Sequence, residues 1–377
     1  MKPALSDLTI AELATRLSAW GFKPSHAERL LRAHYLHGGE IPWADVVVPH
    51  GLREKLEAEY ATSSVTLAAR QVADDGTTKL LLRLADGRTI ETVMMTDFRD
   101  DRVAGCVSSQ VGCAMGCDFC ATAQGGFARN LTPGEIVEQF LHLRREARAV
   151  GKRVQTLVFM GMGEPMLNLD NVKEAIGRIA GPELGALGWK QVTVSTVGLI
   201  PGIEALAASE LGVHLAVSLH APDDETRARL LPAGKRFKAG DILAAAERYE
   251  DVTGRPVTVQ YCLLKGVNDS PAQARQLADL LAARRMHVNV LRYNPTGAGL
   301  SGVAYETSSD EVAEAFIAEL RSQRVVAHFR RPRGRDIDAA CGQLRRKMPL
   351  EAAGTAGDAV LPADSREGTM AQGKTTN

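Results

Sequence analysis

The stretch that most constrains this chain spans residues 112–120 and reads Gly112-Cys113-Ala114-Met115-Gly116-Cys117-Asp118-Phe119-Cys120. Its cysteines follow the spacing C-x3-C-x2-C, which puts three thiolates on one short loop. No fourth cysteine lies close by in the sequence. Three protein ligands suit a metal centre with one coordination position left open, and chemistry takes place at such a position. The spacing therefore predicts a reactive metal centre.

A structural zinc site is the plain alternative for this loop. Closed zinc sites usually combine two Cys-x2-Cys pairs, or a cysteine pair and a histidine pair. No second pair follows here, because Cys262 and Cys341 are isolated in the sequence. A disulfide framework is also disfavoured, since six cysteines in 377 residues is sparse and nothing suggests secretion. The loop favours cluster-type ligation over zinc.

Composition sets only broad limits on function. The formal net charge is zero, so overall charge gives no argument for nucleic-acid binding. Basic residues do cluster between Arg321 and Lys347, and this segment either binds phosphates or forms an ordinary solvated face. No apolar run is long enough to cross a bilayer, and the first residues lack a signal peptide's apolar segment. We therefore expect no membrane association and a cytoplasmic protein.

Hydrophobic periodicity divides the chain into four regions. Residues 1–62 have helical periodicity and predict a small N-terminal helical domain. Residues 63–101 predict a three-stranded β-meander whose strands are separated by Asp-Gly turns. Residues 102–347 alternate strand and helix patterns. Residues 348–377 contain few large apolar side chains and predict a disordered tail.

The third region predicts an α/β fold, a partial (β/α)6 TIM-like barrel. Apolar runs typical of buried parallel strands occur at 102–107, 156–160, 191–195, 213–219, 257–263 and 287–293. Helix-start signals lie between the runs, with N-caps expected at Thr132, Ser270 and Ser308. Parallel barrels carry their active sites at the carboxyl ends of the strands, where the cysteine loop also falls.

The cysteine loop resembles the signature of the radical S-adenosylmethionine (SAM) superfamily, in which an aromatic residue, here Phe119, precedes the third cysteine. The resemblance implies that Cys113, Cys117 and Cys120 hold a [4Fe-4S] cluster whose open iron binds the amino and carboxylate groups of SAM. In this superfamily an electron from the cluster cleaves SAM to a 5′-deoxyadenosyl radical. The protein orients this chemistry.

Polar and glycine residues at successive strand ends are expected to bind SAM. The motif around Gly163 and Glu164 is similar to the superfamily's GGE-type motif: glycines let the backbone approach a ligand, and a carboxylate accepts from its ammonium. Each residue alone is more often a turn or cap residue, but their shared position favours a site. The expected SAM-binding set is Gly163, Glu164, Ser195, Ser218, Leu219, His220 and Asn294.

Three longer strings give a more specific resemblance. Residues 106–113, 122–131 and 333–344 are similar to the adenine-C2 RNA methyltransferases of the RlmN/Cfr family. The similarity runs from about residue 10 to 347 and is weakest in the N-terminal helices. It implies methylation of a specific adenine in 23S ribosomal RNA, with transfer RNA as a second substrate, at two SAM per turnover.

The same resemblance assigns roles to three further residues. It implies that Cys341 is methylated by one SAM and carries the methyl group to adenine C2. It implies that Cys106 then releases the product by forming a disulfide with Cys341, and that Glu91 accepts a proton. On this basis Cys106 and Cys341 should lie close in space. The alternatives are two inert thiols and an outward-facing strand glutamate, and we assign Cys262 to the inert class.

The implied partners are folded RNA, an electron donor such as flavodoxin, and no membrane, with the protein acting as a monomer. The target adenine must leave its base stack to expose C2. Two other functions stay open at this point. One is methylation at adenine C8 by the same cysteines, and the other is a non-enzymatic RNA-binding protein with a structural metal centre.

Overall fold

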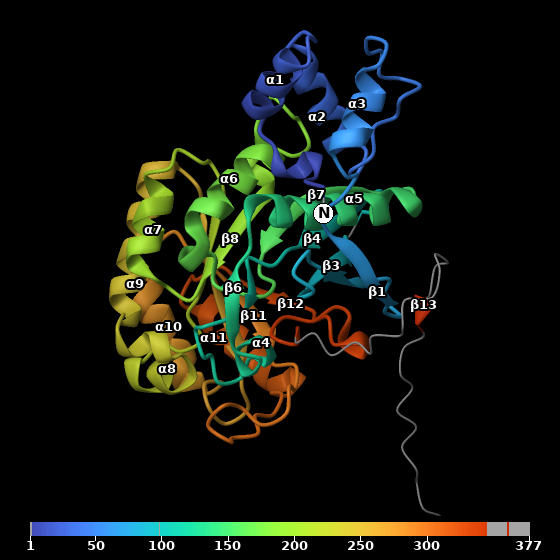
Figure 1. The fold of residues 1–377 in the computed structure, drawn as a ribbon. Coiled ribbons are helices and arrows are strands. Elements are labelled where there is room, and N and C mark those ends of the chain that lie inside the picture. Colours follow the sequence, from blue (N-terminus) through green and yellow to red (C-terminus); the bar gives the residue numbers. More distant parts are fainter. Residues whose placement is uncertain (1, 98, 345–359, 362–377) are drawn as a thin grey trace, which may run out of the picture.

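The computed structural model describes residues 2–97, 99–344 and 360–361. Its strands are β1 Thr66–Val72, β2 Thr78–Arg83, β3 Thr89–Thr96, β4 Arg102–Cys106, β5 Gln110–Gly112, β6 Phe127–Asn130, β7 Arg153–Phe159, β8 Val192–Thr196, β9 His214–Ser218, β10 Val257–Leu263, β11 His287–Arg292, β12 Ala327–Arg330 and β13 Val360–Leu361. Eleven of them form one sheet in the order β12-β11-β10-β9-β8-β7-β4-β3-β2-β1-β13 (Figure 1).

The helices cover this sheet and extend beyond it (Figure 1). They are α1 Ile10–Ala19, α2 His26–Leu36, α3 Leu52–Glu59, α4 Ala121–Gln124, α5 Pro133–Ala149, α6 Leu169–Ala180, α7 Ile200–Ala207, α8 Asp224–Leu230, α9 Ala239–Thr253, α10 Pro271–Leu281 and α11 Asp310–Ser322. Short 3-10 helices lie at Leu5–Asp7, Pro165–Asn168, Trp189–Gln191, Pro232–Lys235 and Arg335–Ile337.

The parallel part of the sheet confirms the predicted α/β architecture. Each neighbouring pair from β4 through β7, β8, β9, β10 and β11 to β12 is parallel. The six predicted strands are all present, and β12 is a further parallel strand that the sequence did not reveal. It has only four residues and ends at Arg330, so it lacks the long apolar run by which the other strands were recognised.

The meander continues the barrel sheet in antiparallel pairing. β1 pairs with β2, β2 with β3, and β3 with β4. Gly76 and Gly87 lie in the two turns and have φ near +80°, which glycine adopts without a steric cost. In the last pair Val93 lies opposite Cys106, so the meander is joined directly to the first barrel strand.

A separate two-stranded sheet, which the sequence did not predict, brackets the cysteine loop. β5 pairs antiparallel with β6, with Gln110 opposite Asn130. Gly112 has φ +80°, and a Cβ there would lie 1.9 Å from the Gly126 carbonyl oxygen. Only glycine therefore lets the two strands approach at the point where the cysteine loop begins.

Two of the three predicted helix caps are confirmed, and one is wrong by a residue. Thr132 and Ser270 both form capping boxes, with Glu135 and Gln273. At α11 the N-cap is Ser309, whose side chain accepts from the Val312 N–H. The predicted cap, Ser308, instead donates to the Asp269 carboxylate at 2.7 Å. Ser308 and Ser309 are adjacent, so the sequence alone allowed either as the N-cap. Ser308 is not the N-cap because its hydroxyl donates to the buried Asp269 carboxylate.

The N-terminal helices sit beside α5 and α6 (Figure 1). Buried Glu138 of α5 accepts hydrogen bonds from the Ser6 and Ser63 hydroxyls, and Arg178 of α6 donates to the Ser6 carbonyl at 2.8 Å. The predicted domain boundaries stay a prediction. Of the segment 348–377, expected to be disordered, only β13 lies within the described residues. No helix in the described ranges has the length and apolar character to span a membrane.

Candidate active site

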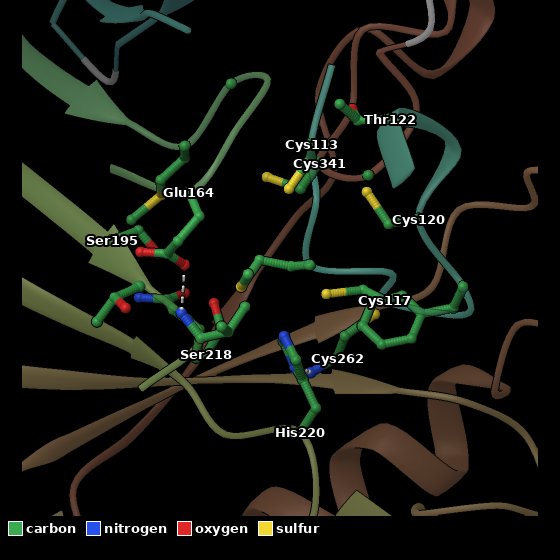
Figure 2. Close-up of a pocket in the computed structure, with 18 of the residues that line it drawn as sticks. Cys113, Cys117, Cys120, Thr122, Glu164, Ser195, Ser218, His220, Cys262 and Cys341 are labelled. Carbon is green, nitrogen blue, oxygen red and sulfur yellow. Dashed lines mark hydrogen bonds between the residues drawn. The ribbon is translucent and has the colours of Figure 1, made fainter. Parts of the chain in front are cut away.

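A cavity of about 170 Å³ opens at the carboxyl ends of the parallel strands (Figure 2). It gathers nearly all the predicted cofactor and cysteine residues, which come from different strand ends and the cysteine loop. These lining residues are Cys113, Cys117, Cys120, Gly163, Glu164, Ser195, Ser218, His220, Asn294 and Cys341. Leu219 is not among them; it is fully buried in the main core. Sequence reasoning missed Thr196, Val197, Gln260 and Tyr293 as further lining residues.

Backbone and side-chain bonds hold the cysteine loop in place. The Cys113 N–H donates to the Gly126 carbonyl at 2.9 Å, and the Asp118 N–H donates to the Leu230 carbonyl at 2.9 Å. Buried Asp118 also accepts from the Ser301 backbone N–H at 2.6 Å and from two hydroxyl groups, those of Ser301 and Tyr305. The three cysteines are thus carried by a braced turn.

The thiols of this loop are half-buried in the wall of the cavity. Burial raises the pKa of Cys113 to about 12. Burial also raises the pKa of Cys117, and the nearby Cys120 and Cys113 raise it further. Among the described residues, no three His, Cys, Asp or Glu side chains are close enough to form a ready metal site. Three thiols around one cavity fit a cluster chemically, because a bound metal ion favours their deprotonated form.

Glu164 is fixed by the backbone around it. Its Oε1 accepts from the Met166 N–H at 3.0 Å, and its Oε2 accepts from the Val197 N–H at 2.9 Å. Burial raises the pKa of this carboxyl to about 7. Gly163 has φ +101°, and a Cβ there would meet the Gln110 side chain at 2.6 Å. The strand-end turn therefore requires glycine and directs an oriented carboxylate at the cavity.

Asn294 carries the clearest sign of a missing polar partner. Its Oδ1 is buried and has no hydrogen-bond partner among the described residues. A buried unpaired carbonyl oxygen is costly, and it accepts readily from an ammonium or hydroxyl group. Ser195 and Ser218 lie around the same cavity (Figure 2). The site therefore fits a polar ligand such as SAM.

His220 positions its neighbours. Burial, with a further contribution from Arg227, lowers its pKa to about 3, so the ring is neutral. Its Nδ1 accepts from the Cys262 N–H at 3.0 Å, and its ring packs edge-on against Phe119, with centroids 5.2 Å apart. The aromatic residue of the cysteine signature is thus held in place by a residue from another strand end.

A second cavity of about 860 Å³ adjoins the first. Cys106 and Cys341 both line it, and Cys341 also lines the first cavity. Burial raises the pKa of Cys106 to about 12, with Cys341 as the next cause. The structure therefore brings together two thiols that are more than 230 residues apart in the chain, from Cys106 to Cys341. Arg330 and Arg331 contribute to the wall of the same cavity.

The loop that carries Cys341 is held from two sides. On the meander side, Asp75 accepts from the Gly334 N–H at 3.0 Å, and Lys79 donates to the Asp338 carbonyl at 3.3 Å. On the side of the cysteine loop, the Ala121 N–H donates to the Gly342 carbonyl at 2.8 Å. These contacts place Cys341 between the two cavities.

Glu91 is buried on β3, with 1% of its surface exposed. Its carboxylate lies 3.5 Å from the Lys79 ammonium. The alternative interpretation of an outward-facing surface residue is therefore wrong. Glu91 is not among the described residues that line either cavity. Val93 and Met95, which follow it on the same face of β3, do line the larger cavity. The structure thus places Glu91 beyond the cavity wall, in a buried ion pair.

Comparison with known proteins agrees with this geometry. Residues 107–278 match the family model described as the radical SAM superfamily. The chain is 65% identical to "Probable dual-specificity RNA methyltransferase RlmN 1" of Opitutus terrae over 92% of this chain and 98% of that protein. It is 41% identical to the RlmN of Rhodopirellula baltica, covering 92% and 91%.

A solved structure agrees as well. A radical SAM methyltransferase from Sphaerobacter thermophilus superposes with a TM-score of 0.84 at 42% identity, covering 92% of this chain and 100% of that one. The resemblance seen in the sequence is confirmed by these similarities. The chain belongs to the RlmN family of dual-specificity RNA methyltransferases, within the radical SAM superfamily.

Proposed function

We propose that this protein methylates C2 of a specific adenine in 23S ribosomal RNA, and of an adenine in transfer RNA, through a methyl group carried on Cys341. The main support for this proposal is the position of Cys341. It lines the cavity of the three loop cysteines and also the cavity that contains Cys106. The activity printed in the relatives' names supports this substrate class.

We assign the residues of the two cavities to different steps of the reaction. Cys113, Cys117 and Cys120 would hold the [4Fe-4S] cluster, while Glu164 and Asn294 would bind SAM. When bound, these groups supply the radical chemistry needed to functionalise an electron-poor aromatic carbon. Cys341 accepts a methyl group and presents it to adenine C2. As the bond between the Cys341 sulfur and the product carbon breaks, Cys106 forms a disulfide with Cys341.

Proton removal is assigned to Glu91. Its carboxylate is buried and paired with Lys79, so water does not compete for it. Glu91 precedes Val93, which borders the larger cavity, by two residues on β3. The substrate would have to approach Glu91, or the wall at Val93 would have to shift, for a proton to pass directly.

RNA would enter through the larger cavity. Arg330 and Arg331 on its wall offer positive charge to phosphates. Arg333 also lines it, but this guanidinium donates to the Thr96 carbonyl and hydroxyl and so holds the C-terminal segment on β3. Basic residues 345–347, part of the predicted phosphate-binding segment, lie outside the described residues. We propose flavodoxin as the electron donor, a monomeric state, and reaction in the cytoplasm.

The direct test uses the anaerobically reconstituted protein with protein-free 23S ribosomal RNA, SAM and a reductant, followed by mass spectrometry of the RNA nucleosides. We expect 2-methyladenosine. Enzyme that holds iron and cleaves SAM but leaves adenosine unmodified would contradict the proposal, and 8-methyladenosine would redirect it to C8. Cys341→Ser should abolish the product. Cys262→Ser changes another cysteine of the same cavity and should retain the product.

A further inference from the structure

Arg227, on α8, is unusual among the charged residues near the site. Its side chain is fully buried, which holds for no other arginine in the described part of the chain. Its Nη1 donates to the Phe237 carbonyl at 3.1 Å, and its Nη2 donates to the Val197 carbonyl. Its Nε is buried without an acceptor among the described residues. The guanidinium therefore donates two hydrogen bonds through its Nη atoms, while its Nε–H has no acceptor among the described residues.

No carboxylate in the described ranges forms an ion pair with Arg227. Three acidic residues stand at the start of α8. Asp223 accepts from the Thr226 N–H at 2.7 Å, Glu225 is exposed, and Asp224, whose charge acts on Arg227 without forming an ion pair, accepts from the Ala239 N–H at 2.8 Å. A buried charge without an opposite charge is costly, and proteins rarely retain one unless something compensates it. Hydrogen bonds to neutral carbonyls supply only part of that compensation.

The cysteine loop lies directly beside α8. The Asp118 N–H donates to the carbonyl of Leu230, the last residue of that helix. Cys117 and Val197 both pack against the small apolar cluster that includes Leu230. Arg227 donates to the carbonyl of Val197, which lines the same cavity as Cys117. The guanidinium is therefore buried on the helix whose end is bonded to the cysteine loop.

We propose that Arg227 is the buried counter-charge of the iron–sulfur centre. It offsets the negative charge of the three thiolates and favours the reduced, more negative state. The inference rests on the proposed function only in requiring a cluster on Cys113, Cys117 and Cys120. Arg227 is a positioning residue in this role. Net charge and hydrogen bonding around a cluster are established determinants of its reduction potential.

The test is a redox titration of the reconstituted protein without SAM, followed by electron paramagnetic resonance of the reduced cluster. Arg227→Met should shift the midpoint to a more negative potential, because the reduced state loses its counter-charge. Arg227→Lys keeps the positive charge, so its midpoint potential should lie close to that of the wild type. Arg229→Met removes an exposed arginine two residues away on the same helix and should leave the midpoint unchanged.

The apo-protein supplies a second readout. Without the cluster the buried charge is uncompensated, so apo Arg227→Met should fold at least as well as apo wild type. Failure of that variant to fold without the cluster would show a purely structural arginine and overturn the proposal. So would a full cluster with an unchanged midpoint, or a loss confined to SAM affinity. If wild-type protein binds no iron after reconstitution, the proposed function itself fails.

Discussion

At the scale of single residues, the pairing of Cys106 with Cys341 gives the sharpest expectation. Cys106→Ala should trap a covalent adduct between Cys341 and the RNA, because the thiol that would break the carbon–sulfur bond is absent. Denaturing electrophoresis with labelled RNA would show the adduct as RNA migrating with the protein. Cys262→Ala should show no such species. Free methylated product from Cys106→Ala, in wild-type amount, would remove Cys106 from the release step.

Two asparagines near the cavity should respond in opposite ways to substitution. Asn294 has an unpaired buried Oδ1, whereas Asn268 donates to the His220 and Cys262 carbonyls and accepts from the Leu264 N–H, each at 2.7 Å. Asn268→Ala should lower the free energy of unfolding by roughly 1–3 kcal/mol, because it leaves buried groups unpaired. Asn294→Ala should leave stability nearly unchanged and weaken SAM binding by about tenfold.

Urea unfolding of the apo-protein and equilibrium dialysis of SAM with the reconstituted protein would measure the two effects separately. If both variants lost stability equally and bound SAM normally, Asn294 would be a structural residue. The comparison is matched, because the two side chains are chemically identical and lie close to the same strand ends.

At the scale of single elements, α5 depends on its N-terminal cap. The Thr132 side chain accepts from the Glu135 N–H, and the Glu135 carboxylate accepts from the Thr132 N–H at 3.0 Å. Thr132→Ala should reduce the free energy of unfolding by about 1 kcal/mol, and Thr132→Ser, which keeps the acceptor, should recover most of it. Chemical denaturation checks both. Equal losses in the two variants would mean that the methyl group, rather than the hydroxyl, matters here.

At the scale of the whole molecule, two buried histidines connect stability to pH. His34 of α2 and His142 of α5 each have a pKa lowered to about 4, first by burial and then by the charge of Arg145. Both are neutral in the folded protein and take up protons on unfolding below their ordinary pKa of about 6.5. Their contribution to stability is therefore present above that value and is lost as pH falls towards 4.

The expected loss is on the order of 3 kcal/mol for each histidine over this range. Buried Glu138 acts in the opposite sense, because burial raises its pKa and acidification then favours its folded form. Urea midpoints at pH 7 and pH 5 should converge in the double variant His34→Gln, His142→Gln. His50→Gln changes an exposed histidine and should leave the pH dependence intact. An unaltered pH dependence in the double variant would contradict this assignment.

Much of the architecture and the site was already present in local sequence. Apolar runs located six strands, β4 and β7 to β11, and Asp-Gly turns located the meander, because these signals depend only on neighbouring residues. Glycine and polar residues after those runs predicted the cavity, since parallel strands end at a common edge. Residues without a local signal were missed: β12 is too short to show an apolar run, and the β5–β6 pairing depends on contact between segments on either side of the loop.

The sequence by itself determined the cysteine loop, the strand-end residues and, through resemblance, the family. Only the tertiary structure decided that Cys341 lies between two cavities, that Leu219 belongs to the core, and that Arg227 is buried on the helix that is bonded to the cysteine loop. The physical reason is that periodicity and motif spacing report contacts along the chain. Burial and the partner of a charge depend on segments that folding brings together from distant parts of it.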